Sequence, residues 1–215
     1  PERFIFYQPR NVVSGDFYWI VGTDRKVISV TADCTGHGVP GAMMSMLGMA
    51  FLNEIIGKKY DLHADDILNR LRSQIVQSLR QKGEEGESQD GMDMALCILD
   101  NENLKLEYSG ANMSVYIFRN GEMRQLQPDK MPIGISAKFT VPFTRQSMDL
   151  KKGDILYTFS DGFEDQFGGP DNKKFLIRKL RNLLTDIHTK SMEEQKNILE
   201  KTLMDWMGNN FQVDD

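Results

Sequence analysis

The sequence has little of what marks several common functional classes. It contains 2 cysteines in 215 residues, too few for a disulfide scaffold, so we expect a reducing compartment. It also has no excess of basic residues, because 26 Lys and Arg stand against 31 Asp and Glu, a formal charge of −5. Nucleic acids and anionic membranes attract basic surfaces. This balance therefore argues against nucleic acid as a partner.

Long apolar stretches and several catalytic motifs are absent as well. The longest nearly apolar run, Met43 to Leu52, has about half the length of a membrane span, so we expect no membrane contact by this segment. C-x-x-C and H-E-x-x-H zinc motifs do not occur. Neither do the G-x-S-x-G elbow or the Walker loop, which removes the usual serine hydrolase and nucleoside triphosphatase signatures.

What is present is the pattern of a mixed α and β domain. Hydrophobic periodicity predicts a hairpin over Phe4–Ile20 and strands at Val27–Ala32, Met94–Leu99, Leu104–Tyr108, Val115–Phe118, Met123–Leu126, Phe139–Phe143 and Ile155–Phe159. It predicts helices at Gly41–Ile56, Ala64–Lys82, Phe175–Ile187 and after a capping box formed by Ser191 and Glu194. Strand groups separated from helix pairs favour one layered α+β domain.

Aspartates recur beside glycine at the ends of apolar strands. They occur in Ser14-Gly15-Asp16, in the run Thr31-Ala32-Asp33-Cys34-Thr35-Gly36 and in Asp161-Gly162, and the sequence closes on Asp214-Asp215. Such anions repel one another unless a divalent cation neutralises them, and an all-oxygen set suits Mg²⁺ or Mn²⁺. The alternative is that Asp beside Gly only forms turns.

Seven motifs in order carry a family resemblance. They are GDFYW (15–19), ADCTGHGVPGAMMSMLG (32–48), DGMDMALC (90–97), SGAN (109–112), DKMPIG (129–134), LKKGDILYTFSDGFEDQFGG (150–169) and QVDD (212–215). Together they resemble the metal-dependent protein phosphatases (the PPM or protein phosphatase 2C family), and within them the bacterial SpoIIE-type serine phosphatases, over essentially the whole chain.

The resemblance implies a fold and a metal centre. The fold is a four-layer α-β-β-α sandwich of two antiparallel sheets flanked by helices, with two Mn²⁺ or Mg²⁺ ions at one edge. Asp33 would bridge the ions and the Cys34 carbonyl would be a ligand. Asp16 would hold one ion, and Asp161 and Asp214 would complete the ligand set of the other. Asp214 is preferred to Asp215 because it matches the first member of the family's terminal pair of aspartates.

The implied activity is hydrolysis of phosphoserine or phosphothreonine by a metal-activated hydroxide, without a phosphoenzyme. Arg10 is the candidate for binding the phosphate, with a solvated surface arginine as the alternative. Asp93, or Asp90 nearby, is a candidate ligand of a third metal, with a strand-start cap as the alternative. His37 is either a general acid or a loop histidine.

The resemblance also predicts context. Residues 1–215 would be a single phosphatase domain, excised from a longer signalling protein with an upstream sensor domain and lacking a last core strand. The substrate would be a phosphorylated regulatory protein, such as an anti-sigma-factor antagonist. The location would be the cytoplasm or the cytoplasmic side of a membrane-anchored sensor, and a homodimer is left open. A catalytically silent binding or sensor module on the same fold is the competing hypothesis, and phosphodiester hydrolysis is a third.

Overall fold

Two antiparallel sheets form the centre of the molecule. The computed structural model describes residues 2–23, 25–57, 61–84, 89–136 and 140–215. Sheet A has the order β1-β2-β3-β4-β7, with β1 (Phe17–Gly22), β2 (Lys26–Cys34), β3 (Met92–Asp100), β4 (Lys105–Ala111) and β7 (Gln146–Asp149). Sheet B has the order β6-β5-β8, with β5 (Val115–Arg119), β6 (Glu122–Leu126) and β8 (Ile155–Tyr157). A short hairpin pairs β9 (Phe167–Gly168) with β10 (Lys173–Lys174).

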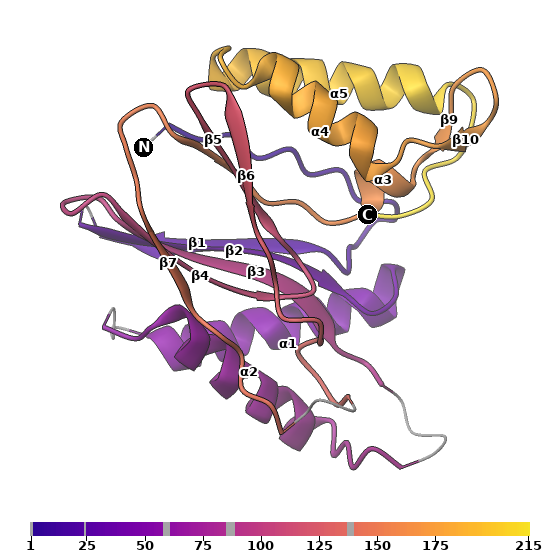
Figure 1. The fold of residues 1–215 in the computed structure, drawn as a ribbon. Coiled ribbons are helices and arrows are strands. Elements are labelled where there is room, and N and C mark those ends of the chain that lie inside the picture. The colour runs from indigo at the N-terminus through magenta and orange to yellow at the C-terminus, as the bar shows by residue number, and fades with distance from the viewer. Residues whose placement is uncertain (1, 24, 58–60, 85–88, 137–139) are drawn as a thin grey trace.

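Helices cover the outer face of each sheet. Figure 1 shows α1 (Gly38–Ile56) and α2 (Ala64–Ser78) against sheet A, and α4 (Ile177–Ile187) and α5 (Met192–Met207) on the side of sheet B. The short α3 (Gly162–Asp165) follows β8. The capping box predicted at Ser191 and Glu194 opens α5. The four layers confirm the predicted sandwich.

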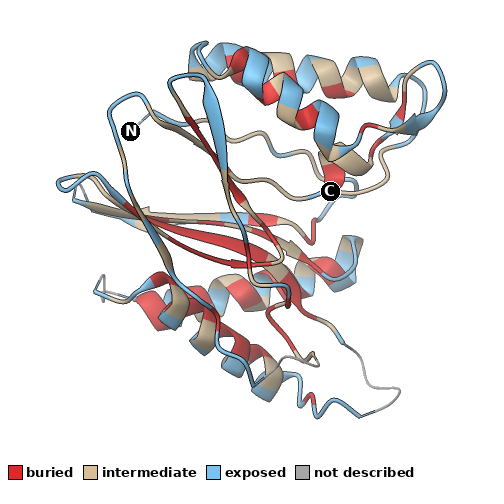
Figure 2. Cartoon of the chain, viewed as in Figure 1, coloured by how far each residue is buried: buried red, intermediate tan, exposed pale blue. Residues whose placement is uncertain are grey.

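Alternating side chains divide the interior into three apolar layers. In β2, Ile28, Val30 and Ala32 face α1 and α2, in one buried cluster with Leu52 and Leu71. A second cluster fills the space between the sheets, and a third lies between sheet B and the two C-terminal helices. Figure 2 shows the buried residues along these interfaces. The β2 side chains between these positions therefore point to the opposite face, towards sheet B.

Helix α1 combines an apolar composition with a partly exposed surface. By length and mean hydropathy (1.4) alone it could cross a membrane, although no uninterrupted apolar run of that length exists in the sequence. Such a helix is equally typical of a protein core, and Met44, Leu52, Ile55 and Ile56 are buried within the first apolar layer.

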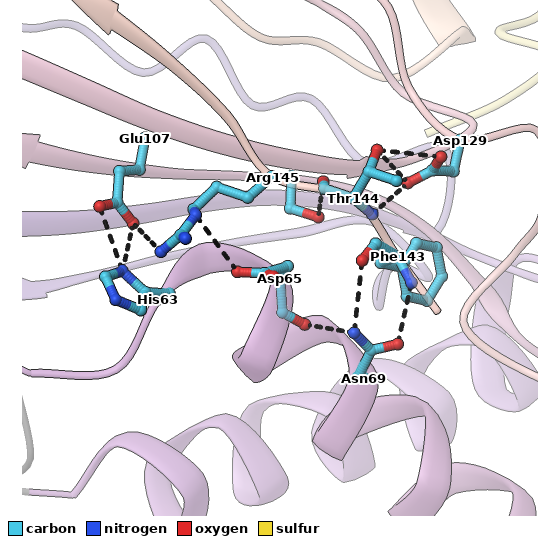
Figure 3. A network of polar contacts seen from close by, with 9 residues as sticks. His63, Asp65, Asn69, Glu107, Asp129, Phe143, Thr144 and Arg145 are labelled. Carbon is cyan, nitrogen blue, oxygen red and sulfur yellow. Dashed lines mark hydrogen bonds and ion pairs between the residues drawn. The ribbon is translucent and has the colours of Figure 1, made fainter. Parts of the chain in front are cut away.

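The segment before β7 corrects the predicted strand at Phe139–Phe143. Residue 139 lies outside the described residues, and 140–143 form a loop tied to α2. The Asn69 side chain accepts from the Phe143 amide (2.9 Å) and Arg72 donates to the Val141 carbonyl (2.8 Å). Figure 3 shows the contact of Asn69 with Phe143 and, next to it, Asp129 accepting from Thr144. Side chains of α2 therefore replace the strand pairing expected here.

The predicted hairpin over Phe4–Ile20 is also wrong. Residues 2–16 have no regular strand, and β1 instead forms a hairpin with β2. Gly15, expected in a turn, lies where the main chain of Gly36 and Gly41 leaves no room for a Cβ. Its role is therefore the close approach of two loops beside the aspartates.

Candidate metal centre

One end of sheet A carries a row of three aspartates, two on neighbouring strands and one directly before β1. Asp33 of β2 pairs directly with Asp93 of β3. Phe17 pairs with Ala32, so Asp16, one residue earlier, comes level with Asp33 on its other side. Directly paired residues of an antiparallel sheet point to the same face. Alternation turns this face towards sheet B, at the edge of the sandwich.

Sheet B brings a further aspartate to this edge. Asp161 follows β8 and starts α3. Its neighbour Ser160 makes a side-chain hydrogen bond with Asp16. The hydroxyls of Thr31 and Thr158 lie 2.6 Å apart and connect the two sheets close by. The residues after β8 are therefore held against the aspartate row.

The C-terminal residues pack between α3 and the loop before β1. The main-chain oxygen of Asp215 lies so close to Gly162 that a Cβ there would overlap it. The Asp215 carboxylate accepts hydrogen bonds from the amides of Arg10 (2.8 Å) and Gly15 (2.7 Å). Asp215 therefore anchors the chain, while Asp214 acts electrostatically on the other aspartates.

The negative charges of this cluster are not balanced within it. Burial raises the pKa of Asp33 to about 9, and repulsion by its carboxylate neighbours adds to this effect. Those neighbours are Asp16, Asp161, Asp214 and Asp93. Burial raises the pKa of Asp16 to about 6, although hydrogen bonds with Ser160 and Asp33 lower it. At neutral pH and without a cation, the hydrogen-bonded Asp16–Asp33 pair therefore retains a proton.

The donor set fits hard divalent cations, but it is not a closed cage. Within the described ranges, no three His, Cys, Asp or Glu side chains are placed to hold a metal ion as they stand. The donors are nevertheless carboxylate oxygens whose repulsion a divalent charge would relieve. A carboxyl–carboxylate hydrogen bond joins Asp16 and Asp33. Binding would therefore require these side chains to exchange a proton for the ion.

The remaining predicted ligands lie at or beside the same edge. The Cys34 carbonyl oxygen borders Gly15, while the Cys34 thiol is buried on the helix side of sheet A. Burial, with the charges of Asp33 and Asp16, raises the pKa of this thiol. It therefore stays protonated and packed.

Asp93 already has partners within the chain. The Asn112 side chain donates to its carboxylate (2.9 Å). Burial raises the pKa of Asp93, whereas Asn112 and the charge of Lys130 lower it. The Asp90 carbonyl accepts from Gln81 (2.6 Å). The third-metal role of Asp93 or Asp90 stays a prediction.

The basic candidates take separate places. Arg10 is exposed and its guanidinium donates to the Val213 carbonyl (2.9 Å), which places it beside the C-terminal aspartates. His37 pairs through Nδ1 with Asn11 Oδ1 at 3.2 Å, as a loop histidine would. The phosphate-binding role of Arg10 stays a prediction.

Sequence reasoning did not identify roles for three polar residues of this region: Ser160, Asn112 and Lys130. Ser160 and Asn112 hold aspartates, and the positive charge of Lys130 acts on Asp93. Each lies inside a recognised motif, but only the packing of distant segments reveals its partner.

The sequence profile of the Stage II sporulation protein E (SpoIIE) family matches residues 23–215. The chain belongs to the SpoIIE family. A search of curated proteins gives no match. Among solved structures, the SiaA-PP2C domain of Pseudomonas aeruginosa is similar at 30% identity and a TM-score of 0.87, covering 99% of this chain and 82% of that one.

Two further structures share the fold at lower identity. The SpoIIE phosphatase domain of Bacillus subtilis, with a fragment of its regulatory domain, is 19% identical with a TM-score of 0.75. The match covers 95% of this chain and 57% of that one, so this chain spans little more than half the length of that structure. RsbX in complex with magnesium is 17% identical with a TM-score of 0.62, covering 91% and 83%. The chain is thus a phosphatase-type domain of the PPM fold.

Proposed function

We propose that this domain is a Mn²⁺- or Mg²⁺-dependent serine/threonine protein phosphatase acting on a phosphorylated regulatory protein in the bacterial cytoplasm. The observation that carries the proposal is the unneutralised aspartate cluster between the sheet ends, in a chain of the SpoIIE family. The magnesium recorded with RsbX, a protein of the same fold, supports the choice of ion.

Asp33 is suited to contact both ions because it stands in the middle of the row and feels the charge of every other aspartate. Asp16 and the Cys34 carbonyl flank it on one side. Asp161 and Asp214 would hold the second ion. When bound, two divalent cations would acidify a water and offset the charge that builds on the phosphoryl oxygens.

The chain's own residues would prepare the site for this chemistry. Ser160 fixes the Asp16 carboxylate through its hydrogen bond. Asp215 holds the loop that carries Arg10 and Gly15, so the guanidinium is kept near the edge where a phosphate would bind. A planar guanidinium can then donate to two phosphoryl oxygens at once.

Phosphate release from p-nitrophenyl phosphate and from a phosphoserine peptide tests the proposal. We expect hydrolysis with Mn²⁺ or Mg²⁺, none with a chelator, and a rate about 10³-fold lower for Asp33→Asn, as for loss of a central electrostatic group. Activity that persists in the chelator or in Asp33→Asn would refute it.

The absence of a preformed cage among the described residues favours the second candidate, a silent binding or sensor module. Calorimetry distinguishes the two: a silent module would show neither Mn²⁺ binding nor hydrolysis in the folded protein.

A further inference from the structure

Two exposed phenyl rings stand near the aspartate cluster. Phe211 is 92% exposed and Phe167 is 40% exposed. Single exposed apolar side chains are common on protein surfaces. These two differ because their main chains are joined. The Gln166 side-chain amide donates both to the Phe167 carbonyl (3.0 Å) and to the Phe211 carbonyl (3.1 Å).

The backbone beneath the rings is firmly held. Gln166 is 1% exposed, and its carbonyl accepts from the Trp206 indole (3.1 Å). Asn210 donates to the Phe167 carbonyl (3.3 Å). The two rings therefore extend from a buried support rather than from a loose loop, and little ordering would be needed to bind them.

The rings also lie at the rim of the candidate metal centre. Phe211 is three residues before Asp214, so the Cα atoms of the two residues lie at most about 11 Å apart, the length of three extended residues. Phe167 pairs with Lys174 across the β9–β10 hairpin, so their side chains point to the same face. The Lys174 ammonium lies 2.6 Å from Asp165, and its charge acts on Asp161. Figure 1 shows the hairpin, α3 and the C-terminus in one region.

Resting on the proposed phosphatase function, we propose that Phe167 and Phe211 form a docking platform for large apolar side chains that flank the phosphorylated residue of the substrate. A cluster of aspartates and cations recognises a phosphoryl group but not its neighbours in the sequence. A substrate segment with its phosphoserine at the cluster must cross the rim within a few residues. Apolar side chains on that segment would remove both phenyl rings from water.

Two matched phosphoserine peptides test this platform. One carries leucine at the second and third positions on each side of the phosphoserine, and the other carries serine there. We expect kcat/KM about tenfold higher for the leucine peptide, which corresponds to about 1.4 kcal/mol. The double variant Phe167→Ala/Phe211→Ala should lose this preference while its hydrolysis of p-nitrophenyl phosphate is unchanged.

Leu104→Ala is the matched control, because Leu104 is 45% exposed and lies between β3 and β4 at the opposite end of sheet A. It should keep the preference. An unchanged preference in the double variant would overturn the platform. If the wild-type protein also sediments as a dimer that this variant loses, a second copy of the chain, and not the substrate, would be the occupant. If the wild-type protein hydrolyses neither p-nitrophenyl phosphate nor either peptide, the phosphatase function itself fails.

Discussion

Asp154 and Asp33 are both shielded carboxylates, but the chain surrounds them in opposite ways. The Asp154 side chain is 3% exposed and is bound by the fork of Arg119 and by the Lys151 amide. The hydrogen bond from Arg119 lowers the pKa of Asp154, whereas burial raises that of Asp33 to about 9.

Asp154 and the aspartate cluster lie at opposite ends of β8. Asp154 directly precedes this strand, and Asp161 of the cluster comes after its end. At the first end the chain supplies the cation itself, which makes the carboxylate a structural group. At the second end carboxylates face carboxylates, which leaves a requirement for positive charge that a ligand can meet. The comparison predicts distinct effects of mutation at each end.

The largest contrast is expected in hydrolysis. Asp154→Asn should keep kcat for p-nitrophenyl phosphate within about threefold in the folded fraction, against the roughly 10³-fold loss expected for Asp33→Asn. Steady-state kinetics with Mn²⁺, normalised by circular dichroism, measures both. Equal losses in the two variants would show that the ends do not differ in function.

Gly162→Ala should affect the ligand-binding end next most strongly. A Cβ at this position would overlap the main-chain oxygen of Asp215, so the C-terminal residues must shift and carry Asp214 with them. We expect Mn²⁺ affinity to fall about 10–100-fold, as for loss of support to a metal ligand. Titration calorimetry measures it. Gly121→Ala, at a hairpin turn with a positive φ and open space around it, is the control for backbone strain placed away from the site.

Thermal stability should respond with opposite signs. Arg119→Gln leaves Asp154 without its cation and should lower the Tm by several degrees. Asp33→Asn removes the need to protonate this buried, repelled group on folding at neutral pH. It should therefore raise the Tm of the chelator-treated protein, at about 2–4 °C per kcal/mol for a domain of this size. Scanning calorimetry decides it. A lower Tm for Asp33→Asn without metal would contradict the repulsion.

The last contrast concerns the pH dependence of the metal-free protein. Asp33 has a raised pKa in the folded state, so the stability it contributes is complete below about pH 4 and is lost as the pH rises towards 9. Asp154 has a lowered pKa, so its contribution is present above about pH 4 and is lost in acid. Urea unfolding from pH 5 to 9 should show a decline that Asp33→Asn flattens and Asp154→Asn does not.

Much of this organisation could be predicted from the sequence where the signal is local. The capping box of α5 and the Asp-Gly motifs depend on neighbouring residues. The predicted hairpin before Ile20 failed because Gly15 serves a long-range contact with Gly36 and Gly41. The strand predicted before Phe143 was replaced by hydrogen bonds from α2.

The same limit applies to the site. The aspartates of the cluster were found from motifs, but their partners were not. The bond of Ser160 with Asp16, and those of Asp215 with Arg10 and Gly15, join segments far apart in the sequence. Sequence periodicity carries no record of such contacts, so only the folded arrangement reveals which carboxylates are anchored and which remain repelled.

The most direct test of the central claim is Mn²⁺ titration calorimetry at pH 7 in buffers of different ionisation enthalpy. If the cluster holds a proton because it lacks a cation, Mn²⁺ should bind and displace that proton, and Asp33→Asn should abolish both binding and proton release. The Asp154→Asn protein should bind like the wild type. Mn²⁺ binding without proton release, or equal binding by Asp33→Asn, would contradict the account.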